Sequence, residues 1–252
     1  MENNIQGKVI IVTGASSGLG AALTRQLAGK GAKLIIGARR VSALDSLATD
    51  LQSSGKEVFY KACDVSDKAQ VQSLVDFALT KFGKIDVLVN NAAIMPASFL
   101  VKNDTDEWDK LIDINIKGVL YGIGAVLPHM RERSTGHIIN VSSTAAHEDI
   151  SPVTTVYSMT KHAVRHITEG LRLEENLAKS NIRVTEMAPG AIDTELKNTV
   201  TDPTMREAAI KFYADKSQLL SAEDMARAIV YAINEPEQIN ISSIVVRPTG
   251  AN

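Results

Sequence analysis

The sequence predicts an α/β fold, in which one doubly wound domain holds a seven-stranded parallel sheet flanked by helices on both faces. Three observations support this prediction. Short runs rich in Val and Ile alternate with helical stretches, a glycine-rich turn follows the first run, and 44% of the 252 residues are hydrophobic. Strands that alternate with amphipathic helices form right-handed βαβ units, which make the strands parallel. No linker rich in Pro, Gly or Ser divides the chain, so we expect a single domain over residues 1–252.

The first half of the chain carries this alternation most clearly. Each strand-like run is short and β-branched, and each stretch that follows places apolar residues on one face of a helix. The stretch 67–83, for example, repeats Val71, Leu74, Val75 and Ala78 at helical spacing. We expect strands at 9–14, 33–38, 57–64 and 85–93, and helices at 21–31, 41–55 and 67–83.

The second half continues the pattern with one exception. Residues 193–220 follow a strand, have weak periodicity and exceed the usual length of a connection. Long connections in compact domains are often lids or binding loops, so we expect a substrate loop there. We expect strands at 136–143, 181–190 and 238–248, and helices at about 105–131, 155–179 and 222–234.

Composition and charge exclude several classes of protein. A net charge of −2 and a pI near 6.2 give no basic field for nucleic acid or an anionic membrane. The N-terminus lacks the pattern of a signal peptide, and no apolar stretch approaches the roughly 20 residues that span a bilayer. Cys63 is the single cysteine, which excludes an intrachain disulfide and a thiolate metal site. We therefore expect a cytoplasmic protein with no metal, no membrane association and no nucleic-acid partner.

A glycine-rich turn, TGASSGLG at 13–20, lies between the first expected strand and the first expected helix. A doubly wound sheet binds nucleotides at this place, because the amides of the helix N-terminus face the phosphates. Gly14 permits the tight turn, Gly18 lets the backbone approach a pyrophosphate, and Gly20 lets the helix pack closely. The two serines between them add hydroxyl donors. We expect a dinucleotide to contact Gly14, Ser16, Ser17, Gly18, Leu19 and Gly20.

The end of the second expected strand indicates which dinucleotide binds. A site that prefers NAD places Asp or Glu about 20 residues after the glycines, where it accepts from the ribose 2′-hydroxyl. Here that place reads GARR, and Arg39 and Arg40 suit a 2′-phosphate through a bidentate guanidinium contact. Two solvated arginines at a strand end are the alternative. We expect NADP(H) as the cofactor, with Arg39 as the principal contact.

Seven motifs then occur in a fixed order along the chain. They are TGASSGLG, CDVSD at 63–67, NNAA at 90–93, Asn115, the VSS that ends at Ser143, YSMTK at 157–161 and APGAIDT at 188–194. As an ordered set they resemble the classical short-chain dehydrogenase/reductase family, from about residue 7 to the C-terminus. The resemblance implies a Rossmann-type sheet of seven strands, hydride transfer with NAD(H) or NADP(H), and assembly as a homotetramer or homodimer.

The same resemblance implies contacts along the cofactor. Asp64 and Val65 resemble the adenine contact at the end of the third strand, and the NNAA motif resembles the loop under the cofactor's ribose. The turn after the sixth strand resembles the one that holds the nicotinamide carboxamide. Asp64 could instead cap a helix, and the Pro-Gly pair could be only a turn. The further expected contacts are Asn91, Ala92, Pro189, Gly190, Ile192 and Thr194.

Tyr157 and Lys161 lie four residues apart in an expected helix, which puts them on one face. Reduction of a carbonyl needs a hydride and a proton, and an ammonium beside a phenol lowers its pKa toward the working range. Lys161 can also reach a ribose hydroxyl, so this pair is expected at the cofactor as well. Ser143 would donate to the carbonyl oxygen, and by resemblance Asn115 would hold a water that continues the proton relay. A half-buried aromatic beside a solvated lysine is the alternative.

Together these residues predict an NADP(H)-dependent carbonyl reductase or alcohol dehydrogenase for a small or medium ketone, aldehyde or secondary alcohol. NAD-dependent alcohol oxidation and a non-catalytic dinucleotide sensor are the alternatives. Tyr157 follows Ser143 by 14 positions, one more than is usual in the family, and the polar loop 147–155 with Glu148 and Asp149 lies between them. The expected substrate pocket is partly apolar and includes Ile94, Met95, Leu100, Ile150, Val153, Leu196, Phe212 and Tyr213.

Overall fold

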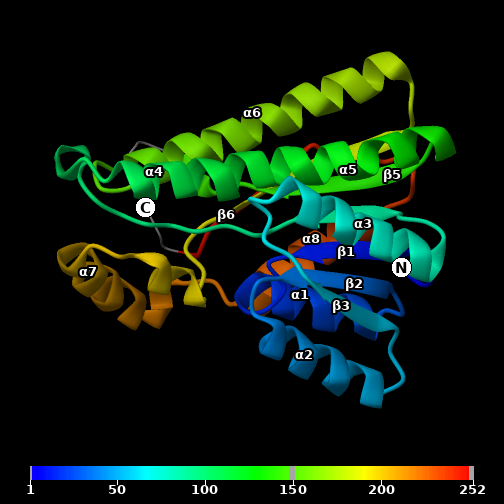
Figure 1. The fold of residues 1–252 in the computed structure, drawn as a ribbon, viewed down its shortest axis with the longest axis horizontal. Helices are drawn as coiled ribbons and strands as arrows, with labels where there is room; N and C mark the ends of the chain where they lie inside the picture. The colour runs from blue at the N-terminus through cyan, green and yellow to red at the C-terminus, as the bar shows by residue number, and fades with distance from the viewer. Residues whose placement is uncertain (1, 148–150, 250–252) are drawn as a thin grey trace.

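Seven parallel strands form one sheet in the structure, a computed structural model that describes residues 2–147 and 151–249 (Figure 1). Their order is β3-β2-β1-β4-β5-β6-β7, and every neighbouring pair is parallel. The predicted seven-stranded, doubly wound fold is therefore confirmed. The strands are β1 (Val9–Thr13), β2 (Lys33–Ala38), β3 (Val58–Ala62), β4 (Val87–Asn90), β5 (Gly136–Val141), β6 (Ile182–Pro189) and β7 (Ser243–Val246).

Helices cover both faces of the sheet (Figure 1). The chain runs outward from β1 to β3 and then returns to place β4 on the other side of β1. This reversal of strand order leaves a crevice outside the carboxyl ends of the central strands, where ligands bind in such sheets. One face carries α1 (Gly18–Gly29), α2 (Val41–Ser53) and α8 (Ala222–Asn234), and the other carries α3 (Lys68–Phe82), α5 (Gly118–Arg133) and α6 (Thr155–Ala178).

The core consists of two apolar layers separated by the sheet. All five residues of β1 are buried, and successive side chains point to opposite faces. Ile10 and Val12 therefore join the layer under α1 and α8, whereas Ile11 joins the layer under α3 and α5. A fully buried aliphatic side chain of this size stabilises the fold by about 1.5–3 kcal/mol. Burial on both faces explains why the strands read as continuous apolar runs.

The segment predicted as one helix at about 105–131 is continuous but contains a π-helical turn. The helix Thr105–Arg133 has 29 residues and an 18-residue window with a mean hydropathy of 1.4. By length and composition alone, this helix could span a membrane, so the expectation that no apolar stretch approaches such a length is wrong. One face of the helix packs on α3 and the sheet, as in a core helix of a globular protein. Its parts are α4 (Thr105–Ile112), the π turn η2 (Asp113–Lys117) and α5.

Residues 193–220, which we call the lid segment, contain a helix that their weak periodicity did not predict. Asp202 caps this helix by accepting hydrogen bonds from the N–H groups of Thr204 and Met205, and Pro203 begins it. None of its residues, all of which the structure describes, is buried, so no apolar stripe marks it in the sequence. The segment comprises η4 (Glu195–Thr199), α7 (Pro203–Ala214) and η5 (Lys216–Gln218).

The two ends of the lid segment are tied together at its base. The N–H of Asp193 donates to the carbonyl oxygen of Leu220 at 2.9 Å, and the N–H of Leu220 donates to that of Ala191 at 2.8 Å. The Asp193 carboxylate also pairs with Lys197 and Lys216, one near each end of the segment. Figure 1 shows α7 standing apart from the helices that cover the sheet. The lid segment is thus a closed loop that projects from the edge of the sheet.

Asp86, directly before β4, joins β1 to the end of α5. One carboxylate oxygen accepts from the N–H of Val9 at 2.8 Å, and the other accepts from Arg133 Nη2 at 2.9 Å. Burial alone would raise the pKa of Asp86, but hydrogen bonds from Lys84, Val9 and Arg133 outweigh it and lower the pKa below its usual value. The charged carboxylate therefore stabilises the fold above its unfolded pKa, and this contribution is lost as pH falls through the folded pKa.

We expect Asp86→Asn to lower the free energy of unfolding by about 1–3 kcal/mol at neutral pH, because it removes a charge-assisted hydrogen bond to Arg133. The difference from the wild type should shrink as the pH falls below the unfolded pKa of aspartate and through the lowered folded pKa of Asp86, where the wild-type carboxylate also becomes neutral. Urea unfolding over this pH range measures it. Asp109→Asn, at an exposed position of α4, is the control and should change stability by less than about 0.5 kcal/mol. Equal losses in the two variants, or a difference independent of pH, would contradict this role.

Candidate active site

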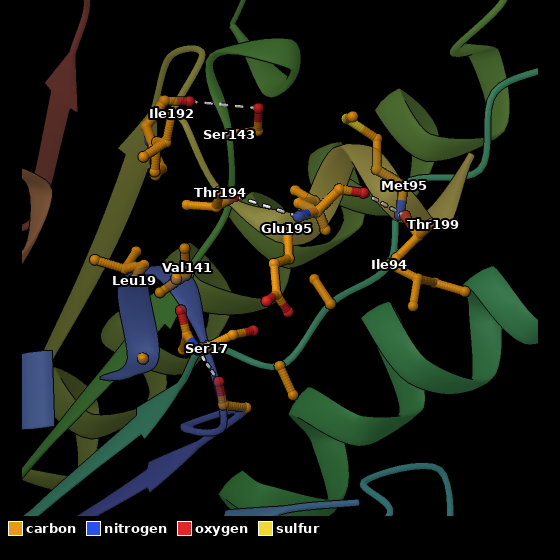
Figure 2. Close-up of a pocket in the computed structure, with 18 of the residues that line it drawn as sticks. Ser17, Leu19, Ile94, Met95, Val141, Ser143, Ile192, Thr194, Glu195 and Thr199 are labelled. Atoms are coloured by element: carbon orange, nitrogen blue, oxygen red, sulfur yellow. Dashed lines mark hydrogen bonds between the residues drawn. The ribbon is translucent and has the colours of Figure 1, made fainter. Parts of the chain in front are cut away.

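A cavity of about 580 Å³ lies at the edge of the sheet where the parallel strands end. Every residue predicted to contact the dinucleotide lines this cavity, and so does Ser143. Of the residues predicted to act in catalysis or to contact the cofactor, all of which the structure describes, Asn115 alone does not line it. Figure 2 shows part of the lining, in which Ser17 and Leu19 of the glycine turn lie near Val141, Thr194 and Glu195. The predicted cofactor contacts and three of the four predicted catalytic residues thus share one cavity.

The glycine turn fits closely between neighbouring backbone segments. Gly14 and Gly18 have φ angles of +67° and +51°, in the left-handed region that favours glycine. A Cβ on Gly20 would lie 2.4 Å from the carbonyl oxygen of Gly14, and a Cβ on Gly18 would lie 3.0 Å from Cβ of Thr194. Asn91 holds the turn from the end of β4, since its Nδ2 donates to the Gly14 carbonyl oxygen at 3.3 Å. Turns of this kind leave backbone N–H groups exposed at a helix N-terminus, where phosphates bind in such sheets.

Hydroxyl and guanidinium groups surround the turn. Ser17 is the N-cap residue of α1 but makes no side-chain cap, and its side chain lines the cavity. Arg40 follows β2, donates from Nε to Ser16 Oγ at 3.3 Å, and places Nη1 2.7 Å from Glu195 Oε2. Arg39 is exposed and has no hydrogen-bond or ion-pair partner in the described part of the chain. These groups are the donors that phosphate oxygens require.

The end of β3 forms the far end of the cavity. Asp64 lines it and also holds the local turn, since its Oδ1 accepts from the N–H of Ser66 at 3.0 Å and from its hydroxyl at 2.7 Å. The N-cap residue of α3 is Asp67, whereas Asp64 holds the turn before the helix, so within the alternative of a cap formed with Ser66 and Asp67 the capping belongs to Asp67. Burial raises the pKa of the neighbouring Cys63 thiol to about 11, which keeps it protonated and unreactive at neutral pH.

Ser143, Tyr157 and Lys161 meet at the inner wall of the cavity. Tyr157 and Lys161 are buried on the first turns of α6, and the Ser143 side chain lies near enough to the Tyr157 phenol to act against the rise in its pKa. Lys161 Nζ lies 5.8 Å from the centroid of the Tyr157 ring and donates to the carbonyl oxygen of Val141 at 2.9 Å. Ser143 Oγ also donates to the carbonyl oxygen of Pro189 at 3.4 Å. A strand end and a helix therefore hold the three groups in fixed positions.

The pKa of Tyr157 moves in the direction opposite to the prediction. Burial raises it to about 12, although the hydrogen bond with Ser143 acts against this rise, and nearby Tyr213 adds to it. Burial also lowers the pKa of Lys161 to about 8. The predicted lowering by Lys161 is not seen, because its ammonium donates to the Val141 carbonyl and the desolvation of the phenol dominates. At neutral pH the phenol therefore keeps its proton, as a proton donor must.

Asn115 lies behind the cavity on the π turn of the long helix. Its Oδ1 accepts from the N–H of Ile94 at 3.0 Å, and its Nδ2 donates to the Ile94 carbonyl oxygen at 3.0 Å. Nδ2 also donates to Thr160 Oγ1 at 3.1 Å, next to Lys161 in α6. In this structure Asn115 thus joins the segment after β4 to the catalytic helix. Its role in a water relay stays a prediction.

A buried carboxylate that the sequence analysis did not identify supports the strand end before Ser143. Glu186 in β6 accepts from Ser142 Oγ at 2.6 Å and from Ser243 Oγ at 2.8 Å. His147 Nε2 lies 2.9 Å from the same carboxylate. The signal in the sequence that could have identified Glu186 is a charged residue within the predicted strand at 181–190. The polar loop residues Glu148 and Asp149 and the pocket candidate Ile150 lie outside the described residues.

The lid segment lines the cavity beside the segment after β4. Thr199 Oγ1 accepts from the N–H of Met95 at 2.8 Å, which joins the lid segment to the segment after β4 (Figure 2). Among the predicted pocket residues, Leu100, Val153 and Phe212 do not line the cavity. The predicted residues that do are Ile94, Met95, Leu196 and Tyr213, and the lid residues that were not predicted are Glu195, Asn198 and Thr199.

Comparisons with known proteins agree with this arrangement. The sequence model of the short chain dehydrogenase family matches residues 8–204. An uncharacterized oxidoreductase of Staphylococcus saprophyticus is 48% identical and aligns over 98% of this chain and 98% of its own length.

Solved structures give the same result. An alcohol dehydrogenase of the archaeon Thermococcus sibiricus, complexed with 5-hydroxy-NADP, has a TM-score of 0.85 and 28% identity over 98% of this chain and 99% of its own. A short-chain dehydrogenase/reductase of Burkholderia phymatum, in complex with NAD, has a TM-score of 0.88 and 29% identity. The alignment covers 96% of this chain and 89% of that protein's chain. With this fold, the glycine turn and the Ser-Tyr-Lys cluster, the chain belongs to the short-chain dehydrogenase/reductase family of oxidoreductases.

Proposed function

We propose that this protein is an NADP(H)-dependent oxidoreductase that interconverts a small or medium ketone or aldehyde and the corresponding alcohol. The observation that carries the proposal is the position of Ser143, Tyr157 and Lys161 in the cavity that the glycine turn also lines. The residues expected along a dinucleotide, from the glycine turn to the turn after β6, all line this one cavity of about 580 Å³, which supports binding of such a cofactor. When bound, the nicotinamide would supply or accept the hydride.

Side chains of this protein can supply the proton that reduction of a carbonyl requires. Tyr157 holds its proton at neutral pH, because burial raises its pKa to about 12. Its phenol would give this proton to the developing alkoxide, while the Ser143 hydroxyl donates to the same oxygen and stabilises its charge. The Lys161 ammonium lies on the same wall, so it would stabilise the phenolate that the transfer leaves behind. A protein that only sensed the dinucleotide would not need these three groups together.

The arginine pair supports NADP(H) over NAD(H). Arg39 and Arg40 line the cavity at the end of β2, where NAD-preferring sites place a carboxylate. A guanidinium matches a 2′-phosphate in charge and geometry. The two similar structures were solved with an NADP derivative and with NAD respectively. The preference proposed for this chain therefore rests on its own arginines.

The cavity lining supports a neutral substrate of modest size. Ile94, Met95 and Leu196 supply apolar surface, while Thr199 and Tyr213 add hydroxyl groups near the lid segment. Such a mixture suits an alkyl or aryl carbonyl with limited polarity. The similar protein of Thermococcus sibiricus is an alcohol dehydrogenase, which is in keeping with this substrate class.

We expect Tyr157→Phe to lower kcat for ketone reduction by about 100-fold or more, because it removes the proton donor. NADPH affinity should change by less than about threefold, because the ring remains. NADPH oxidation with a panel of neutral ketones measures the rate, and fluorescence titration measures the affinity. Tyr231→Phe, at a half-exposed position of α8, is the matched control and should keep the wild-type rate. A Tyr157→Phe enzyme with near-full rate would refute the catalytic assignment.

We expect Arg39→Ala to raise the KM for NADPH by roughly 10-fold or more, since a charge-assisted contact to phosphate contributes about 1.5–3 kcal/mol. The KM for NADH should stay within about twofold, because NADH lacks the 2′-phosphate. Arg25→Ala, in an exposed ion pair with Asp50, removes the same charge outside the cavity and should affect neither cofactor. Equal losses for NADPH and NADH in Arg39→Ala would remove the 2′-phosphate argument.

A further inference from the structure

Glu195, the first residue of η4, places a carboxylate against the groups that surround the glycine turn. Its Oε2 lies 2.7 Å from Arg40 Nη1, and the nearby Ser17 side chain helps to lower the pKa of the carboxylate. Arg40 in turn donates to Ser16. In Figure 2 the Glu195 side chain extends from the lid segment toward the turn that carries Ser17. One carboxylate thus connects the lid segment, the end of β2 and the turn.

These contacts are ones that a nucleotide phosphate would make. Arg40 stands where the 2′-phosphate of NADP(H) is expected, and Ser17 stands where the pyrophosphate is expected. Carboxylate and phosphate oxygens use the same guanidinium and hydroxyl donors. The hydrogen bond from Arg40 lowers the pKa of Glu195, against an opposing effect of burial, and Ser17 lowers it further, so the carboxylate is charged at neutral pH. The Glu195 carboxylate therefore occupies donor groups that the phosphates of a bound dinucleotide would also use.

We propose that Glu195 is a specificity-determining residue that competes with the cofactor's phosphates for Arg40 and Ser17. The inference rests on the proposed function, since it assumes that a dinucleotide binds in this cavity. A 2′-phosphate would have to displace the carboxylate from Arg40 or lie beside its negative charge, and either event weakens NADPH binding. NADH has no charge at this position. Glu195 therefore narrows the preference for NADPH that the two arginines create.

The size of this effect follows from the exposure of the pair. The Arg40 and Glu195 side chains are 52% and 54% exposed, so water screens their attraction. Exposed pairs of this kind change an equilibrium by about two- to fivefold. Since dissolved salt screens exposed charges, the effect should be larger at low ionic strength than at high ionic strength. A small but cofactor-selective change is therefore the expected signature.

The direct test is Glu195→Gln in the full chain, with dissociation constants for NADPH and NADH measured by fluorescence titration at low salt. NADPH should bind about two- to fivefold more tightly than to the wild type, and NADH should gain less. Glu207→Gln makes the same change of charge at an exposed position of α7, outside the cavity, and should leave both constants unchanged. Unchanged or weaker NADPH binding in Glu195→Gln would overturn the inference, as would an equal gain in Glu207→Gln.

The double variant Arg40→Ala/Glu195→Gln tests whether Glu195 acts on NADPH binding through Arg40. In Arg40→Ala the shared guanidinium is gone, so adding Glu195→Gln should tighten NADPH binding less than it does in the wild-type background. The same gain in that background would show that Glu195 acts without Arg40 and would refute the proposed competition. The two proposals can also be told apart. A wild-type protein that binds neither dinucleotide refutes the proposed function, whereas one that binds NADPH but does not respond to Glu195→Gln refutes only this inference.

Discussion

The close packing of the glycine turn on itself and against the segments after β4 and β6 is the constraint on which the site depends. A Cβ on Gly14 would lie 2.7 Å from Cα of Ala92, and one on Gly20 would lie 2.4 Å from the Gly14 carbonyl oxygen. Gly18 lies against Thr194 on the other side. These contacts fix the separation between the ends of β1 and β4 and the segment after β6. The two walls of the cavity therefore have a set spacing, and a ligand in it must run along the backbone of the turn.

Rigid elements then determine where the reactive groups lie relative to that backbone. Tyr157 and Lys161 occupy the first turns of α6, and Ser143 follows β5, whose end Glu186 supports through Ser142. Burial favours the neutral form of both Tyr157 and Lys161. A charge that develops in such a site interacts strongly with its neighbours, because little water screens it. The same burial that raises the pKa of the phenol thus makes a nearby ammonium more effective once the phenol has lost its proton.

The sequence was sufficient for the parts of the molecule that obey local rules. The strands β1, β2 and β4 are short runs rich in Val, Ile or Leu, and parallel strands bring their carboxyl ends together, so the glycine turn and Tyr157 could be placed at one edge. It was insufficient for α7, because a helix that buries no residue has no apolar stripe. The direction of the pKa shift of Tyr157 depends on burial by distant residues. The contact between Arg40 and Glu195 joins positions far apart in the chain, and no local pattern marks it.

In the function proposed above, this cavity brings a nicotinamide and a carbonyl together beside Tyr157. Transfer of deuterium distinguishes this reaction from others, with NADPH that carries deuterium at both positions of the nicotinamide C4 and a neutral ketone as substrate. We expect an alcohol product with one deuterium on the carbinol carbon, while the hydroxyl proton comes from the protein and exchanges with water. A product without deuterium at that carbon, or no alcohol from any ketone tested, would contradict it.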